Sequence, residues 1–287
     1  MAIRIVTDSN CDLPEVIIQE YGVTVVPMYI NIGTDSYLDG VTMSRREFYE
    51  GLPHFHSHPM TSVPGPGTFV EIFDELAGEG ATEILCIHIS GSLSAMVNSA
   101  RLAAEEWDRL PVTVFDSGNL TLGTGLQVVA AARAAAKGLS MAEILALLED
   151  QASRTYCFAV LDTVEFLLRS GRLTRFQYGL ASVLQIKPLL KMHGGEPEME
   201  RVRTSNGATK RLMELTEGLG LLEELALVHT HAVERAEALG QQAHSLFPAI
   251  SALLEGKAPL SAEVTPVIGT HIGPGAVGFV AIQARRR

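Results

Sequence analysis

Strand-like and helix-like segments alternate through the first half of the chain, and this alternation restricts the fold more than any other feature. Short apolar runs at 3–7 and 84–89 have the length and composition of buried strands, and a helical pattern follows each of them. The run at 23–32 is rich in β-branched residues and predicts one further strand. Regular β-α alternation is typical of an open, mostly parallel sheet with helices on both faces.

The pattern changes near residue 158. Apolar runs at 186–192 and 199–203 flank the segment 193–197, whose Gly-Gly and Pro predict a hairpin turn. We therefore expect an α/β protein of two domains. Residues 1–157 should form a mostly parallel sheet flanked by helices, and residues 158–287 a smaller α+β domain. A length of 287 residues agrees with this division, because single cores tend to split near that size.

Composition narrows the possible partners and location. A net charge of −11 argues against nucleic acid as the main partner. No apolar run is long enough to span a bilayer, so we expect no stable membrane insertion. The three cysteines are far apart and form no CxxC pair, which favours a reducing cytoplasm and argues against a zinc site. His54, His56 and His58 lie in a Pro-flanked loop predicted over 53–66, where we expect no metal either.

The segment 267–278 contains His271 among four glycines, one proline and one threonine. Glycine lets the backbone approach a ligand closely or adopt positive φ, and proline stiffens the chain. A turn between two strands is the simplest interpretation, since these are the usual turn residues. The functional interpretation is a loop that fixes the imidazole and leaves space beside it.

Hydroxyl side chains add to this second interpretation because they lie in loops beside the predicted strands of the first half. Ligands bind at the carboxyl ends of strands in open α/β sheets. Any one hydroxyl is explained as a helix cap, but together with His271 they form a donor-rich set suited to an anionic head group such as a carboxylate. The candidates are Thr61, Ser62, Ser92 and Ser94. The sequence contains no dinucleotide, phosphate-loop, zinc-protease or nucleophile-elbow motif, so we expect no cofactor.

Six motifs in chain order resemble those of the DegV proteins, which are similar to the fatty-acid-binding subunits of bacterial fatty acid kinase. The resemblance covers nearly the whole chain. It departs from the family at Ala95-Met96, where Gly-Thr is usual, and at Ser170, which replaces a glycine. The motifs are Thr7-Asp8-Ser9 with Asp12-Leu13-Pro14, Thr61-Ser62, Leu93-Ser94, Leu168-Arg169-Ser170-Gly171-Arg172, Ile186-Lys187-Pro188-Leu189-Leu190 with Val202-Arg203-Thr204, and Gly269-Thr270-His271-Ile272-Gly273-Pro274-Gly275.

The resemblance implies that a long-chain fatty acid such as palmitate binds between the domains, with the segment 267–278 closing the site. It implies that Thr61, Ser94 and His271 hold the carboxylate, while Ser62, Ser92 and Thr270 are secondary candidates. The chain would then be a carrier in fatty acid metabolism rather than an enzyme, because the ATP chemistry belongs to a separate kinase subunit. Basic residues cluster between 169 and 203 in this acidic chain, so Arg172 and Arg203 are candidates for contacting that subunit.

Two other functions remain open at this point. A serine hydrolase or acyltransferase would use Ser94 as nucleophile, His271 as base and Asp8 to orient the imidazole. Against it, Ser94 lacks the flanking glycines of a nucleophile elbow. The remaining alternative is a binding protein for a different small carboxylate or lipid.

Overall fold

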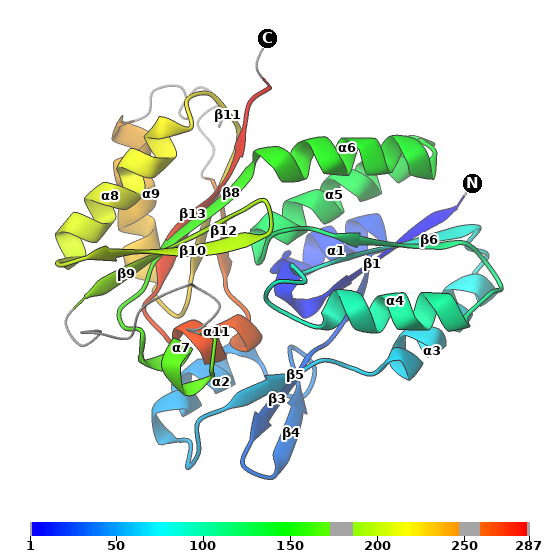
Figure 1. Ribbon diagram of the computed structural model, residues 1–287, viewed down its shortest axis with the longest axis horizontal. Helices are drawn as coiled ribbons and strands as arrows, with labels where there is room; N and C mark the ends of the chain where they lie inside the picture. The colour runs from blue at the N-terminus through cyan, green and yellow to red at the C-terminus, as the bar shows by residue number, and fades with distance from the viewer. Residues whose placement is uncertain (1, 173–185, 247–258, 286–287) are drawn as a thin grey trace.

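The structure is a computed structural model that describes residues 2–172, 186–246 and 259–285, and these form three sheets (Figure 1). The first sheet is entirely parallel, with the strand order β2-β1-β6-β7. Its strands are β1 (Ile3–Asp8), β2 (Thr24–Val26), β6 (Glu83–His88) and β7 (Val112–Asp116). The predicted parallel sheet is therefore present.

Helices cover both faces of this sheet because successive strand residues point to opposite sides. Ile5 belongs to the core beneath α1 (Glu15–Tyr21), α5 (Leu122–Ala136) and α6 (Met141–Arg154). Its neighbour Val6 belongs to a second core, beneath α3 (Pro66–Gly78) and α4 (Met96–Glu106). Short 3-10 turns at Ser9–Cys11 and Leu52–His54 complete this half.

The second sheet has six strands in the order β10-β9-β8-β13-β11-β12. The predicted turn at 193–197 is confirmed, because β9 and β10 pair antiparallel and both Gly194 and Gly195 have positive φ. Helices α8 (Ser205–Gly218) and α9 (Val233–Leu246) pack on one face, and the short α7 (Glu165–Arg169) follows β8. The strands are β8 (Thr155–Val160), β9 (Lys187–His193), β10 (Glu196–Val202), β11 (Leu222–His229), β12 (Leu260–Glu263) and β13 (Val277–Gln283).

One continuous core joins the two sheets. Helix α5 contacts β1 and β6 on one side and β8 and β13 on the other. Ten of its 15 residues are buried, mostly alanine, glycine and valine, and these small side chains let both sheets approach closely. The predicted boundary between residues 157 and 158 falls inside β8, which belongs wholly to the six-stranded sheet.

A third, small antiparallel sheet corrects two expectations. The run at 23–32 is not one strand: β2 ends at Val26, Pro27 follows, and β3 (Tyr29–Ile32) joins a different sheet. Proline lacks the N–H that a continuous ladder needs. The loop expected over 53–66 contains a strand, β5 (Met60–Ser62). It pairs with one edge of β3, and β4 (Asp35–Leu38) pairs with the other edge. Three residues are too few to show a strand pattern in a sequence.

The segment 267–278 also differs from the predicted loop. Residues Pro266–Ile272 form a helix, α11, which packs against α2 (Arg45–Gly51) and α7, and β13 begins only at Val277. Thr265 caps the helix, since its side chain accepts from the Val267 N–H, and Pro266 occupies the first turn, where no N–H is needed. Within the described ranges, no helix combines the length and apolar character needed to cross a bilayer.

Candidate functional site

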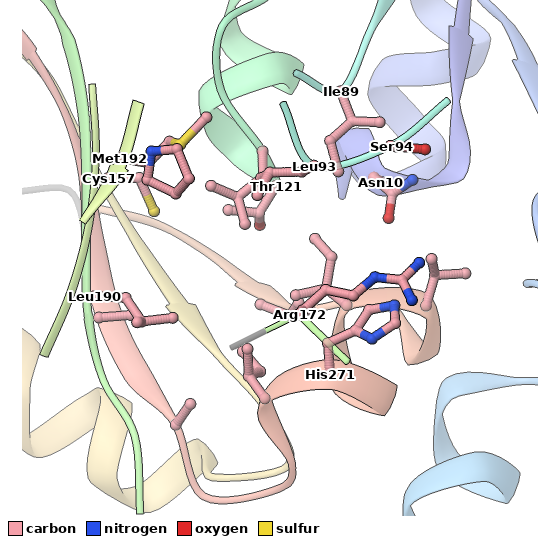
Figure 2. A pocket seen from close by; sticks show the side chains of 18 of the residues that line it. Asn10, Ile89, Leu93, Ser94, Thr121, Cys157, Arg172, Leu190, Met192 and His271 are labelled. Atoms are coloured by element: carbon pink, nitrogen blue, oxygen red, sulfur yellow. The ribbon is translucent and has the colours of Figure 1, made fainter. Parts of the chain in front are cut away.

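A cavity of about 400 Å³ lies between the two larger sheets, and its walls are mostly apolar (Figure 2). Strand β8 shows how the sequence builds one wall. Phe158 and Val160 pack with α8 and α9 on the far face, whereas Cys157 and Ala159 alternate with them and line the cavity. Leu190 on β9 lies on the same side. The cavity therefore faces the inner surface of the six-stranded sheet.

Polar side chains gather at the opposite end of the cavity. Thr61 on β5 and His271 on α11 meet there, with Thr61 Oγ1 2.9 Å from His271 Nε2. Ser94 lies two residues before the first residue of α4, and its Oγ accepts a hydrogen bond from the Met96 N–H at 3.3 Å. Figure 2 shows Ser94 and His271 at this end, away from Cys157, Leu190 and Met192. Thr61, Ser94 and His271, all predicted from the sequence, thus line one cavity.

Other polar residues that sequence reasoning did not place in the site also line the cavity: Asn10, Arg172, Thr121, Lys191, His229 and Thr230. Asn10, in the turn after β1, is fully buried. Arg172 follows α7, donates one hydrogen bond to the Ser170 carbonyl at 2.9 Å, and points to the His271 side of the cavity in Figure 2. Arg172 was assigned to a partner surface because basic residues cluster near it in the sequence. Its position adds a cavity-lining role that the sequence did not indicate.

The remaining candidates have different environments. Ser62 lines the cavity edge, where its Oγ accepts from Asn31 Nδ2 at 3.0 Å. Ser92 is exposed and pairs with the Ser90 hydroxyl at 2.9 Å, and it is not among the cavity-lining residues. Thr270 is buried but donates to the Pro266 carbonyl one turn earlier, so α11 itself uses its hydroxyl. Arg203 is exposed just beyond the end of β10.

The glycines around His271 have specific packing reasons. A side chain on Gly269 would overlap the hydroxyl of Tyr49 on α2. Gly273 ends α11 with a φ of 75°, in the left-handed region that favours glycine, and a side chain there would overlap the ring of Phe166 on α7. Both glycines allow α11 to sit closely between α2 and α7, and this close packing fixes the position of His271.

The segment that leads into α11 is held by side chains from the N-terminal half. Tyr49 donates to the Val264 carbonyl at 2.9 Å, and Arg45 donates to the Glu263 carbonyl. The Thr265 N–H donates to Asp12 Oδ1 at 2.9 Å, and the Thr265 hydroxyl donates to Asp39. We call these four side chains, Asp12, Asp39, Arg45 and Tyr49, the α11 clamp. The clamp joins β12 and α11 to the parallel-sheet half.

Burial dominates the electrostatics of the clamp. It raises the pKa of the Asp12 carboxyl from 3.8 to about 7, although Arg45 at 3.0 Å and the Thr121 hydroxyl at 2.6 Å favour the charged form. Burial also raises the pKa of Asp39, opposed by hydrogen bonds from Ser9 and Thr265. The clamp therefore concentrates ionisable groups with little solvent around them.

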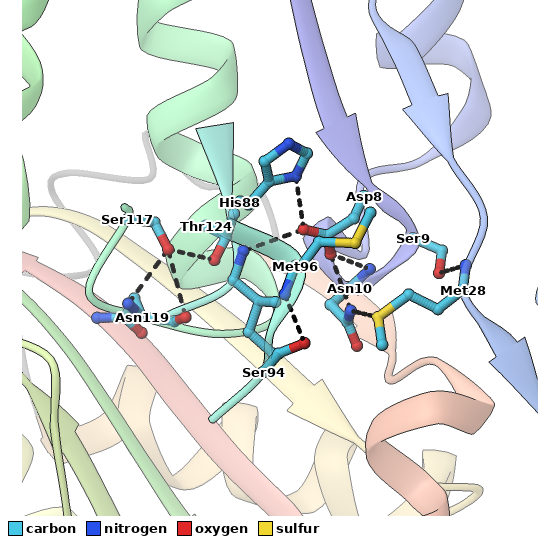
Figure 3. A network of polar contacts seen from close by, with 11 residues as sticks. Asp8, Ser9, Asn10, Met28, His88, Ser94, Met96, Ser117, Asn119 and Thr124 are labelled. Atoms are coloured by element: carbon cyan, nitrogen blue, oxygen red, sulfur yellow. Dashed lines mark hydrogen bonds and ion pairs between the residues drawn. The ribbon is translucent and has the colours of Figure 1, made fainter. Parts of the chain in front are cut away.

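Asp8 does not orient His271, contrary to the hydrolase alternative. Its Oδ2 lies 2.9 Å from Nδ1 of His88 and accepts the Ile89 N–H at 3.0 Å (Figure 3). Its Oδ1 accepts from both the backbone and the side chain of Asn10, at 3.0 and 2.8 Å. Both oxygens are thus committed to the loops after β1 and β6. Asp8 and His88 are fully buried and fasten those two loops together.

The sequence contained a partial signal for Asn10 but none for His88. Asn10 follows Thr7-Asp8-Ser9 at the carboxyl edge of the sheet, where ligands bind. His88 ends an apolar strand and was indistinguishable from a core residue.

Among the described residues, no group of three or more His, Cys, Asp or Glu side chains is placed to hold a metal ion.

A parallel α/β unit and a six-stranded sheet with an inner cavity between them define the class of protein: an α/β fold whose two larger sheets enclose a cavity. The DegV family model matches residues 2–284, so this chain belongs to the DegV family.

Similar proteins are known in both sequence and structure. A DegV domain-containing protein of Deinococcus radiodurans is 37% identical over 288 residues, covering 99% of each chain. A DegV protein of Thermus thermophilus, described as binding fatty acid, is 32% identical, with a TM-score of 0.85 over 99% of this chain and 100% of that one. DegV of Bacillus subtilis, described as a fatty acid binding protein, is 27% identical, with a TM-score of 0.85 and the same coverage.

Proposed function

We propose that this protein binds a long-chain fatty acid, with the carboxylate at the Thr61–Ser94–His271 end and the acyl chain along the apolar wall. The observation that carries the proposal is the polarity of the cavity, which matches that of a fatty acid. Each buried methylene contributes about 0.8 kcal/mol, so ten of them contribute about 8 kcal/mol. The fatty acids bound by the Thermus and Bacillus relatives support the same ligand class.

The carboxylate needs partners because burying a charge without them is costly. Thr61 and Ser94 supply hydroxyl donors, and His271 supplies a ring nitrogen. Arg172 adds a positive charge on the same cavity, and guanidinium groups pair well with carboxylates. We therefore assign Arg172 to the head group of the lipid.

We further propose that the loaded protein presents the carboxylate to a separate ATP-dependent fatty acid kinase subunit. Arg203 is the basic residue we assign to that contact, because it is exposed at the end of β10 and lies outside the cavity. The presentation role makes the protein a carrier, and the phosphoryl transfer belongs to the partner.

Titration of delipidated protein with hexadecanoate tests the binding proposal. Thr61→Val and Ser94→Ala should each weaken binding about 2- to 13-fold, the equivalent of about 0.5–1.5 kcal/mol for one neutral hydrogen bond. His271→Ala should weaken it more if the imidazole carries a proton in the complex. Ser205→Ala is the matched control, since Ser205 is an exposed serine at the start of α8 and does not line the cavity. Unchanged affinity in all three cavity variants would remove these residues from the site.

Native mass spectrometry of protein purified from cells provides an independent test. A retained mass equal to that of a long-chain fatty acid supports the proposal, whereas a retained small carboxylate or a different lipid would replace it. Hydrolysis of a chromogenic ester that is lost in Ser94→Ala would instead support the hydrolase alternative.

A further inference from the structure

The side-chain amide of Asn10 has a fixed orientation, and that orientation aims its oxygen into the cavity. Asp8 Oδ1 already accepts the Asn10 backbone N–H at 3.0 Å, so it is an acceptor. The group 2.8 Å from it must then be the Asn10 Nδ2 donor, because a carboxylate oxygen and an amide oxygen repel at that distance. The second Nδ2 proton faces Met28, whose Sδ lies 2.7 Å from Asn10 Nδ2. Both amide protons are therefore used.

The Asn10 oxygen is left as a buried acceptor. Asn10 is fully buried, and its Oδ1 has no hydrogen-bond partner among the residues that the structure describes. Figure 2 shows this oxygen turned toward the cavity, on the side where Ser94 and His271 lie. A buried acceptor without a donor costs about 1–3 kcal/mol. A ligand that supplies an O–H at this point removes that cost, whereas a bare carboxylate offers only acceptors.

We propose that Asn10 is a specificity-determining residue that accepts a hydrogen bond from an O–H group on the head of the bound lipid. The O–H has two possible sources: a hydroxyl on the carbon next to the carboxylate, or the carboxyl group itself in its protonated form. Both leave the acyl chain on the apolar wall. The inference rests on the proposed binding of a fatty acid and names which head groups that site prefers.

A pair of matched ligands tests the first source in the unmodified protein. 2-Hydroxyhexadecanoate and 2-fluorohexadecanoate have substituents of similar size, but only the hydroxyl can donate. We expect one enantiomer of the hydroxy acid to bind at least about fivefold more tightly than the fluoro acid, the equivalent of about 1 kcal/mol for one hydrogen bond. Asn10→Leu, whose side chain has a similar shape without the acceptor, should abolish this preference. If that variant does not fold, the ligand pair in the unmodified protein decides alone.

A second measurement tests the protonated carboxyl. The ¹³C chemical shift of bound [1-¹³C]hexadecanoic acid, followed against pH, reports its state of protonation. A bound acid that keeps its proton well above the pH at which free carboxylic acids ionise, and that releases it at a lower pH in Asn10→Leu, identifies the carboxyl O–H as the donor to Asn10. Equal affinity for the hydroxy and fluoro acids together with a fully ionised bound carboxylate overturns the inference, since neither source then supplies a donor.

Failure of the inference is distinguishable from failure of the proposed function. Plain hexadecanoate that binds and responds to Thr61→Val, without either donor effect, refutes the role of Asn10 and keeps the fatty acid site. No binding of any of the three acids refutes both.

Discussion

Enlarging Leu190 should shorten the acyl chain that the cavity accepts. Leu190 lies on β9, opposite the polar end, and is half-buried against the cavity. Phenylalanine has three more side-chain carbons than leucine. If these displace three methylenes of the ligand, at about 0.8 kcal/mol each, hexadecanoate loses about 2.4 kcal/mol and binds about 60-fold more weakly.

The assay is calorimetric titration of delipidated Leu190→Phe with hexadecanoate and with decanoate. A chain that ends before Leu190 should keep its affinity within about threefold, so the two acids should respond differently. Leu190→Met is the control, because it conserves volume and should change neither affinity by much. An equal loss for both acids would place Leu190 elsewhere on the ligand path or reflect general damage. No loss for hexadecanoate would refute the path along β9.

The other predictions concern the α11 clamp and the partner surface. The folded protein keeps a proton on Asp12 that the unfolded chain releases above 3.8, so the free energy of unfolding should fall as pH rises from about 4 to about 7. Denaturant titrations should show a shallower fall in Asp12→Asn, and an identical slope would contradict the role of burial. Gly269→Ala should displace α11 from Tyr49, lowering unfolding free energy by about 1–3 kcal/mol and weakening hexadecanoate binding; unchanged values for both would show that α11 has room to shift. Arg203→Glu should weaken a pull-down of the kinase subunit and leave hexadecanoate affinity unchanged, whereas lost lipid binding would place Arg203 in the site.

The sequence predicted the parallel sheet, its helices and the hairpin of the second sheet because those elements rest on local periodicity. It failed where the determinant is tertiary. The four glycines of 267–278 were interpreted as turn residues. Position 269, however, lies in a helix and requires glycine because the Tyr49 hydroxyl occupies the space that a side chain would need. Helix α11 begins at a local cap, Thr265, but it is held in place by the clamp, whose side chains are more than 200 positions away in the sequence. No local pattern reports such a contact.

The candidate site shows the same contrast between what local sequence indicates and what only tertiary contacts determine. Thr61, Ser94 and His271 were predicted from loop position and family resemblance, and the structure brings them to one cavity. Arg172 was not predicted to line the cavity, because charge clustering in a sequence does not distinguish a surface from a cavity wall. The hydrolase alternative needed Asp8 as a partner of His271, but Asp8 pairs with His88, whose position on β6 only the sheet register reveals.

The clamp also explains how a site between two sheets keeps its geometry. Thr61 comes from the small sheet, Ser94 from the parallel-sheet half and His271 from a helix that follows the six-stranded sheet. A relative movement of these units would separate the three side chains. The helix α5 core resists such movement by apolar packing, but packing is not directional. Hydrogen bonds are directional, and the clamp makes four of them to three consecutive residues directly before α11. Burial makes ionisation of Asp12 costly at neutral pH, and the Arg45 charge and the hydrogen bonds from Thr121 and Thr265 oppose that cost. The hydrogen bond from Thr265 also holds the start of α11, and through it His271, against the parallel-sheet half.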